Sequence, residues 1–435
     1  MNFKIREKWQ EFKKQTTRQK VVCSVTISFF LLLFSYVICN TSIPLPNEMD
    51  VLQGWEQYKS FSGLNKDSIP KEILLVNVSY DKELVDYEKN DVLVGQYPIT
   101  DRKKLYDFLL LAQKADNYKY IMLDVIFEKG ISSSHDSLLF SLIASMDRIV
   151  IPVHKDVPLQ DSILYSKSAN ADYTTTWNET NFARFKFRWD NVPTVPLKMY
   201  HDISGKDISK HGLIYTSNNW LCKNGITLQL PIKLTKDLEL DDNKLKIKVL
   251  QLGADLLASS SLIPIANEIK DKIIVIGDLD SNTDLHDTYV GPQPGSIINL
   301  NAYYALQRGD HIIFGWFGTR LLFYLIVAFV YFFVTLCYLN GFSLSSITDN
   351  IWLKALISFG SISFLFWMVA IIGYLFFDTV YKLWIPIIAF SILGTIIFIY
   401  SLIKETRHAK KTSSTTAKPA GDDSNGEQLQ NPISE

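Results

Sequence analysis

Between about residues 70 and 310, short apolar runs alternate with segments whose apolar residues recur at helical spacing. The β-branched runs are typical of buried strands and lie at Glu72–Tyr80, Tyr120–Phe127, Arg148–Val153 and Lys272–Leu279. The helical segments are Thr100–Ala115, His135–Met146 and Ile297–Gly309. Strands that alternate with helices predict an α/β domain with a mainly parallel sheet that is covered on both faces.

The region from 155 to 267 departs from this alternation. Segments such as "FARFKFRW" and "GITLQLPIKL" place apolar residues at every second position. That period is typical of strands with one buried face. We therefore expect a β-rich insertion in the same domain.

Four stretches are apolar enough to cross a bilayer, for which about 20 residues suffice. They are Val21–Cys39, Leu321–Leu339, 355–377 and 383–403. The first resembles a signal peptide, but its apolar core is long and no small-residue cleavage pattern follows it. We therefore expect four transmembrane helices, one before the α/β domain and three after it.

The charges indicate the orientation of these spans. Residues 1–20 carry seven Lys/Arg against two Glu, and Arg407, Lys410 and Lys411 follow the last span. Because basic flanks stay inside, we expect a cytoplasmic N-terminus and a disordered cytoplasmic tail at 404–435. Residues 40–311, with 29 basic and 36 acidic side chains, are then extracytoplasmic. The expected location is the inner membrane of a bacterium.

Composition narrows the functional classes. The acidic balance of residues 40–311 lacks the clustered basic side chains that a nucleic-acid binder needs. Cys222 alone falls in the outer domain, so we expect no internal disulfide there. The chain contains no phosphate-loop, GxSxG or HExxH motif. We expect no enzyme, no cofactor and no bound metal.

Polar residues at strand ends are the candidate site. Asp81 follows the first strand, Asp124 lies inside the second, and Asp284, His286 and Asp287 follow the last. Ligands of parallel sheets bind beyond the carboxyl ends of the strands, where these five residues would meet. The alternatives are structural: Asp124 caps a helix or pairs with an Arg, and Asp284, His286 and Asp287 fix the loop by local hydrogen bonds. A Ca²⁺ or Zn²⁺ site is the weaker alternative, because the spacing matches no metal motif.

The blocks "VNVSYDKEL", "GQYPITDRKKLYDFLLLAQKADNYKYIMLDVIFEKG", "HDSLLFSLI" and "KIIVIGDLDSNTDLHDTYVGPQPGSIINLNAYYALQRGD" carry a family resemblance. Together they resemble the CHASE2 domain, an extracytoplasmic sensor module of bacterial signalling proteins, over roughly residues 45 to 403. The family places this domain after one span and before three, as expected here. Thr288–Tyr289 stands where the family usually has Thr-Pro. About 32 residues follow the last span, too few for the kinase or cyclase domain that many members carry.

The resemblance implies a sensor or interaction protein that binds a ligand or an envelope partner. Such a protein would relay its state to a separate cytoplasmic protein, and an oligomer would be compatible with this role. The alternative is a structural membrane scaffold for envelope complexes without sensing. An extracytoplasmic hydrolase has the least support.

Overall fold

The computed structural model describes residues 48–62, 70–89, 92–172, 184–189, 191–234, 247–258, 263–281 and 284–313, with isolated positions 18, 19, 21, 22, 25, 26, 36 and 40. The four expected spans lie outside these residues, apart from the isolated positions in the first one. Among the described residues, no helix combines the length and the hydrophobicity needed to cross a bilayer.

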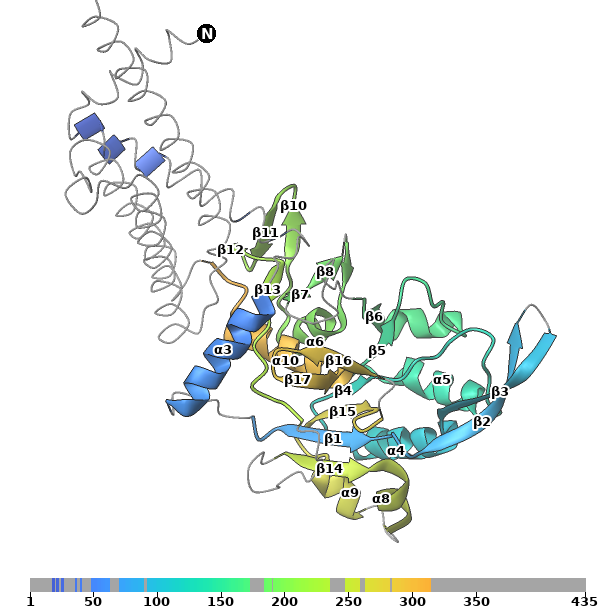
Figure 1. Ribbon diagram of the computed structural model, residues 1–435. Helices are drawn as coiled ribbons and strands as arrows, with labels where there is room; N and C mark the ends of the chain where they lie inside the picture. Colours follow the sequence, from blue (N-terminus) through green and yellow to red (C-terminus); the bar gives the residue numbers. More distant parts are fainter. Residues whose placement is uncertain are drawn as a thin grey trace, which may run out of the picture. The chain divides into compact units, whose positions relative to one another are not determined.

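A six-stranded sheet forms the centre of the α/β domain, with strand order β14-β1-β15-β4-β5-β6 (Figure 1). Its strands are β1 (Ile73–Asn77), β4 (Tyr120–Leu123), β5 (Ile149–Val153), β6 (Ser168–Asn170), β14 (Lys248–Gln251) and β15 (Ile273–Gly277). Every neighbouring pair is parallel. The expected α/β fold with a mainly parallel sheet is confirmed.

Successive residues of the central strands face opposite sides of the sheet and enter two separate cores. In β1, Ile73 and Leu75 join the first core, and Leu74 and Val76 join the second. Because both faces are buried, these strands are apolar throughout rather than alternating with polar residues. This explains why uninterrupted apolar runs predicted them.

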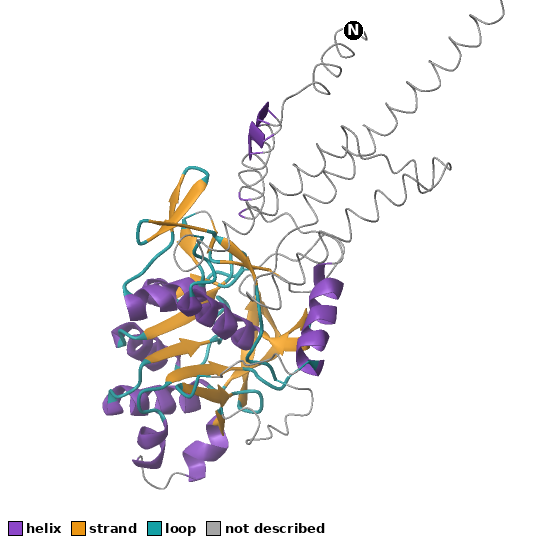
Figure 2. Cartoon of the chain, turned by 90° about the vertical axis from the view of Figure 1, so that its left-hand side faces the viewer, coloured by secondary structure: helices purple, strands orange, loops and turns teal. Residues whose placement is uncertain are grey.

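Helices cover both faces of the sheet (Figure 2). The first core includes residues of α3 (Glu48–Phe61), α6 (Val195–Ser204) and α10 (Gly295–Arg308). The second core includes residues of α4 (Arg102–Ala115), α5 (Asp136–Ser145), α8 (Leu252–Ala258), α9 (Ile263–Glu268) and the 3₁₀ helix η1 (Ser162–Lys167).

Short antiparallel pairs surround this body. They are β2 (Lys82–Lys89) with β3 (Val92–Thr100), β7 (Arg184–Lys186) with β13 (Gly225–Thr227), β8 (Arg188–Trp189) with β9 (Val192–Pro193), and β16 (Leu285–Thr288) with β17 (Gly291–Pro294). A three-stranded sheet joins β10 (Ser209–His211), β11 (Ile214–Ser217) and β12 (Trp220–Cys222). The β2–β3 hairpin projects from the body (Figure 1).

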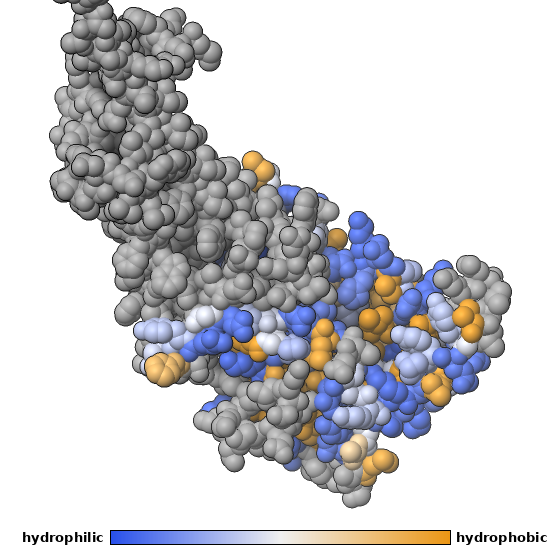
Figure 3. Space-filling model, in the orientation of Figure 1, coloured by the Kyte–Doolittle hydropathy of each residue, from blue (hydrophilic) through white to orange (hydrophobic). Residues whose placement is uncertain are grey.

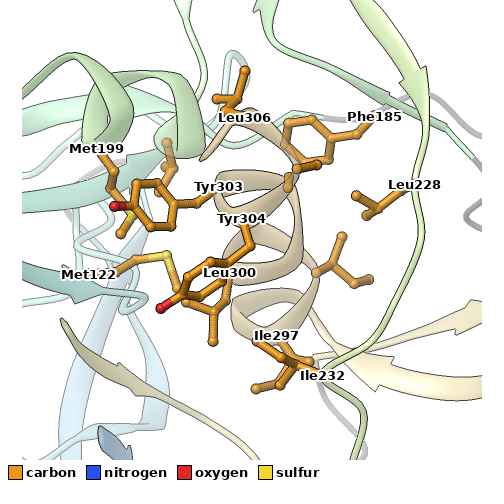
Figure 4. Packing of buried hydrophobic residues seen from close by; sticks show 14 of the residues in the cluster. Met122, Phe185, Met199, Leu228, Ile232, Ile297, Leu300, Tyr303, Tyr304 and Leu306 are labelled. Atoms are coloured by element: carbon orange, nitrogen blue, oxygen red, sulfur yellow. The ribbon is translucent and has the colours of Figure 1, made fainter. Parts of the chain in front are cut away.

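The helix α10 lies deep in the first core, where the segment 225–234 runs beside it (Figure 4). This segment buries every second residue, as a strand would, but only its start pairs with another strand. Side-chain amides replace the missing strand. Asn301 of α10 accepts from the Ile232 amide at 3.0 Å and donates to the Ile232 carbonyl at 2.7 Å. Gln293 makes the same pair of contacts with Leu234 at 2.8 Å each.

Two expectations about local structure need correction. The helix expected from Thr100 begins instead at Arg102, with Asp101 as its N-cap, and the Asp101 carboxylate accepts from the Lys104 amide at 3.0 Å. The region 155–267 also contains β6 and β14, which belong to the main sheet. Both strands are short, so their sequences did not stand out from the segments around them.

A buried ion pair joins α4 to α5. Arg102 is 1% exposed, and its Nε lies 3.5 Å from Oδ1 of Asp136. Its guanidinium group stacks on Phe127 at 4.4 Å and donates to the Ile126 carbonyl at 3.1 Å. Burial lowers the pKa of Arg102 to about 10. Because the guanidinium remains charged at neutral pH, Asp136 is a structural partner that the second core requires.

The contact between α10 and Ile232 gives a stability prediction. Asn301→Leu keeps much of the side-chain volume but leaves the amide and the carbonyl of Ile232 without partners. We expect a loss of about 1–3 kcal/mol for each buried group left unpaired. Thermal or denaturant unfolding of the full-length chain measures this loss. Gln96→Leu, which replaces an exposed amide on β3, is the control and should change stability by about 0.5 kcal/mol or less. Equal effects of the two substitutions would contradict the assignment.

Candidate functional site

The chain leaves neighbouring strands of the sheet towards opposite faces. After β1 and β4 it continues into α4 and α5, which pack on the second core. After β15, which lies between these strands, it continues through β16 and β17 into α10 on the first core. Connections that diverge in this way open a crevice at the carboxyl edge of a parallel sheet, where ligands of such folds bind.

A pocket of about 290 Å³ lies at this edge. Its lining residues come from the ends of β4 and β5, the β16–β17 region, the first turns of α10 and the segment around β7; they are Asp124, His154, Ala171, Phe185, Asp284, His286, Gly295, Ile298 and Asn299. The lining therefore combines apolar side chains with carboxylates, imidazoles and an amide. This combination is typical of sites for small polar molecules.

Asp124 directly follows β4, and its backbone amide donates to the Ile276 carbonyl of β15 at 2.7 Å. Within the described part of the chain, its carboxylate has no hydrogen bond or ion pair, so the expected helix cap or Arg partner is not found there. Burial raises the pKa of Asp124 well above its ordinary value, and the charge of Asp284 raises it further. A protonated Asp124 can donate a hydrogen bond to a ligand, as an ionised one cannot.

Asp284 and His286 lie at the N-terminus of α10. Oδ1 of Asp284 is 3.4 Å from Nε2 of His286, and the Gly295 amide donates to the Asp284 carbonyl at 3.2 Å. A Cβ at Gly295 would stand 3.2 Å from both carboxylate oxygens and 3.3 Å from the imidazole. Glycine at this position therefore lets the helix approach the pair closely.

Asp81 serves a different purpose from the one expected. It does not line this pocket. Its Oδ1 is 2.7 Å from Nζ of Lys104, and its Oδ2 accepts from the Gly253 amide at 2.9 Å. A Cβ at Gly253 would stand 2.1 Å from Oδ1 of Asp81. The carboxylate thus holds the start of α8 against α4.

Asp287 is exposed on β16 and is not part of the pocket lining. Asp278, which also follows β15, is held by several hydrogen bonds. The Asp278 carboxylate accepts from the Ser79 hydroxyl at 2.6 Å and from the Ser281 amide at 3.0 Å. These hydrogen bonds, with one from Lys82, overcome burial and lower the pKa of Asp278 to about 2. The carboxylate network after β1 and β15 is satisfied and structural.

The sequence reasoning missed His154 and Phe185. His154 directly follows β5, as Asp124 follows β4, so the strand-end rule could have found it. Its Nδ1 is 3.2 Å from Oδ1 of Asp172, which orients the ring. Phe185 belongs to β7 inside the insertion, and no local signal marks it. Among the described residues, no group of three His, Cys, Asp or Glu side chains is arranged to hold a metal ion.

Asp124 gives a prediction for the pH dependence of stability. The pKa of this carboxyl is about 3.8 in the unfolded chain and higher in the folded protein. Its contribution to stability is therefore fully present below pH 3.8 and is lost as the pH rises through the pKa of the folded protein. Asp124→Asn, which resembles the protonated form, should therefore be more stable than the natural chain at neutral pH. The difference should shrink as the pH falls towards 4, which unfolding curves across pH measure. Asp287→Asn is the exposed control, and the account fails if both variants give the same pH profile.

No family model, no curated protein and no solved structure matches the chain. The resemblance to the CHASE2 domain therefore stays a prediction from the sequence blocks. The function of the chain has to be argued from the pocket and from its connection to α10.

Proposed function

We propose that the chain is a membrane-anchored extracytoplasmic sensor that binds a small polar ligand and relays its presence to a separate cytoplasmic protein. The location follows from the sequence: four apolar spans in the inner membrane of a bacterium, with both termini in the cytoplasm. The ligand site is the pocket at the carboxyl edge of the sheet.

One observation carries the proposal: α10 borders the pocket at one end and leads towards the second expected span at the other. Gly295 and Ile298, in its first turns, line the pocket. Gly309 ends the helix in the left-handed conformation, and the chain then runs to the span expected at Leu321–Leu339. A helix of 14 residues is about 21 Å long, so a displacement at one end reaches the other.

The pocket suggests the chemistry of the ligand. Asp284 offers a carboxylate at the helix end, and Asp124, when protonated, offers a donor. Phe185 and Ile298 supply the apolar wall. The fitting ligand is a small molecule with a positively charged or hydrogen-bond-donating group on one side and an apolar part on the other. Its binding has to favour one of two arrangements of α10, because a ligand shifts a conformational equilibrium only by its differential affinity.

The hairpin β2–β3 supports a second function, that of a scaffold for envelope proteins. Leu84 is 66% exposed, Val94 60% and Tyr97 51%. A projecting two-stranded hairpin with apolar side chains in solvent is suited to docking a partner. The sensor remains the first proposal, because a scaffold gives the polar pocket no role.

Thermal unfolding of the purified full-length chain against divalent ions, sugars, amines and envelope extracts tests the proposal. A ligand at about 100 times its Kd stabilises the native state by about 2.7 kcal/mol. We expect some compound to stabilise the natural chain and Asp287→Asn, but not Asp284→Asn. Asp287 is the matched control because it lies on the same hairpin outside the pocket. Equal stabilisation of all three proteins would place the site elsewhere.

A further inference from the structure

The small sheet β10–β12 presents apolar side chains and lysines together at the surface. Leu213 is 72% exposed, Trp220 54% and Ile214 48%. Lys206 and Lys210 are exposed beside them. Figure 3 shows apolar atoms next to hydrophilic ones at the β10–β11 end of the molecule. We propose that this sheet rests in the headgroup layer of the membrane and binds anionic phospholipid there. The inference rests on the membrane anchoring of the proposed function.

The segment before the domain is bonded directly to this sheet. The Tyr36 hydroxyl donates to the Cys222 carbonyl of β12 at 3.0 Å and accepts from the Tyr215 amide of β11 at 3.0 Å. Oδ1 of Asn40 accepts from the Asn224 amide at 2.8 Å. Tyr36 stands three residues before Cys39, the end of the first expected span, so these hydrogen bonds tie the sheet to the segment next to that end.

The segment that leaves the domain is bonded to the same strand. The Ile313 amide donates to the Leu221 carbonyl at 2.9 Å, and the Lys223 amide donates to the His311 carbonyl at 2.7 Å. The chain thus passes along the edge of β12 shortly before Leu321, where the second expected span begins. Each headgroup layer is about 5–7 Å thick. A sheet bonded to both segments that enter the membrane lies within reach of that layer.

The side chains fit this environment. Tyr215 and Cys222 are buried in the first core, so the alternate residues of β11, among them Ile214, point to the opposite, outer face. Leu213 stands in the turn between β10 and β11. Trp220 begins β12 opposite Ser217, on the same face as Tyr215 and Cys222 but at the far end of the strand, where 54% of it is exposed. Trp is enriched at membrane interfaces, and its ring suits the boundary between headgroups and acyl chains.

The charge selects anionic lipid. The acidic side chain nearest in sequence to the two lysines, Asp207, is engaged by Arg188, whose Nη2 lies 2.8 Å from each of its oxygens. Lys206 and Lys210 therefore add positive charge to the patch. A lysine close to an anionic surface favours the bound state about fivefold.

Depth-dependent quenching tests the inference. The full-length chain, with Cys23, Cys39 and Cys337 replaced by Ala, carries a fluorophore at Leu213→Cys. It is reconstituted into vesicles of phosphatidylcholine and phosphatidylglycerol that contain a quencher near the headgroups. The label should be quenched by this lipid, more strongly with phosphatidylglycerol than without it. The same label at Leu257→Cys, 85% exposed on α8, should not be quenched.

A second experiment tests the role of the positive charge with the double variant Lys206→Gln and Lys210→Gln. This double variant should lower the preference for anionic vesicles about fivefold per lysine, measured as the ratio of quenched to unquenched label. Two outcomes overturn the inference. If the label at 213 is quenched by iodide in the aqueous phase but not by the lipid quencher, the sheet is exposed to water rather than to headgroups. A label shielded from both shows that a protein or a second copy of the chain covers it.

Failure of the anchoring itself gives a separate result. If alkaline carbonate releases the whole chain from cell membranes, the proposed four-span topology is wrong and this inference falls with it. If the chain resists carbonate and only the label at 213 is unquenched, the topology stands and the lipid contact alone is refuted.

Discussion

The side-chain amide of Asn301 takes the place of a β-strand, and the arrangement of the first core depends on it. It satisfies both backbone groups of Ile232 and also donates to the Ile297 carbonyl of its own helix at 2.8 Å. Asn301 itself is 0% exposed. Buried backbone groups need hydrogen-bond partners. The segment 225–234, called the strap below, can therefore pack against α10 only where side chains supply those partners. The helix is thereby held on two sides, by the sheet and by the strap.

A helix fixed in this way determines what its two ends can do. Its N-terminus stands against Asp284 and His286, because Gly295 leaves room for them. Burial and the nearby charge of Asp284 together raise the pKa of Asp124. A carboxyl group whose pKa is strongly raised inside a pocket is common at functional sites. Beyond the other end of α10, the chain pairs with β12, which also carries the contacts of Tyr36.

The sequence predicted those parts of the fold that repeat a simple pattern. The central strands β1, β4, β5 and β15 are apolar throughout because both faces are buried, and α4, α5 and α10 follow from helical spacing. The same reasoning did not predict the hydrogen-bond partners of the strap. Its alternation is real, but side chains from distant parts of the chain, rather than a neighbouring strand, satisfy most of its backbone. The strand-end rule located Asp124, Asp284 and His286 but also selected Asp81, because position after a strand does not reveal which partner a carboxylate meets. Buried Arg102 was missed, since an Arg in a first helical turn ordinarily faces solvent.

The central claim is that α10 and β12 connect the pocket to the segments that lead into the membrane. Hydrogen–deuterium exchange of the full-length chain with Gly295→Ala tests it without a ligand, since the added methyl group presses on Asp284 and His286. Gly95→Ala, where a Cβ meets nothing within 4 Å, is the control. The account predicts faster exchange in Gly295→Ala, but not in Gly95→Ala, throughout α10 and at the Ile313 and Lys223 amides about 21 Å away. A change confined to the residues around the pocket would contradict it.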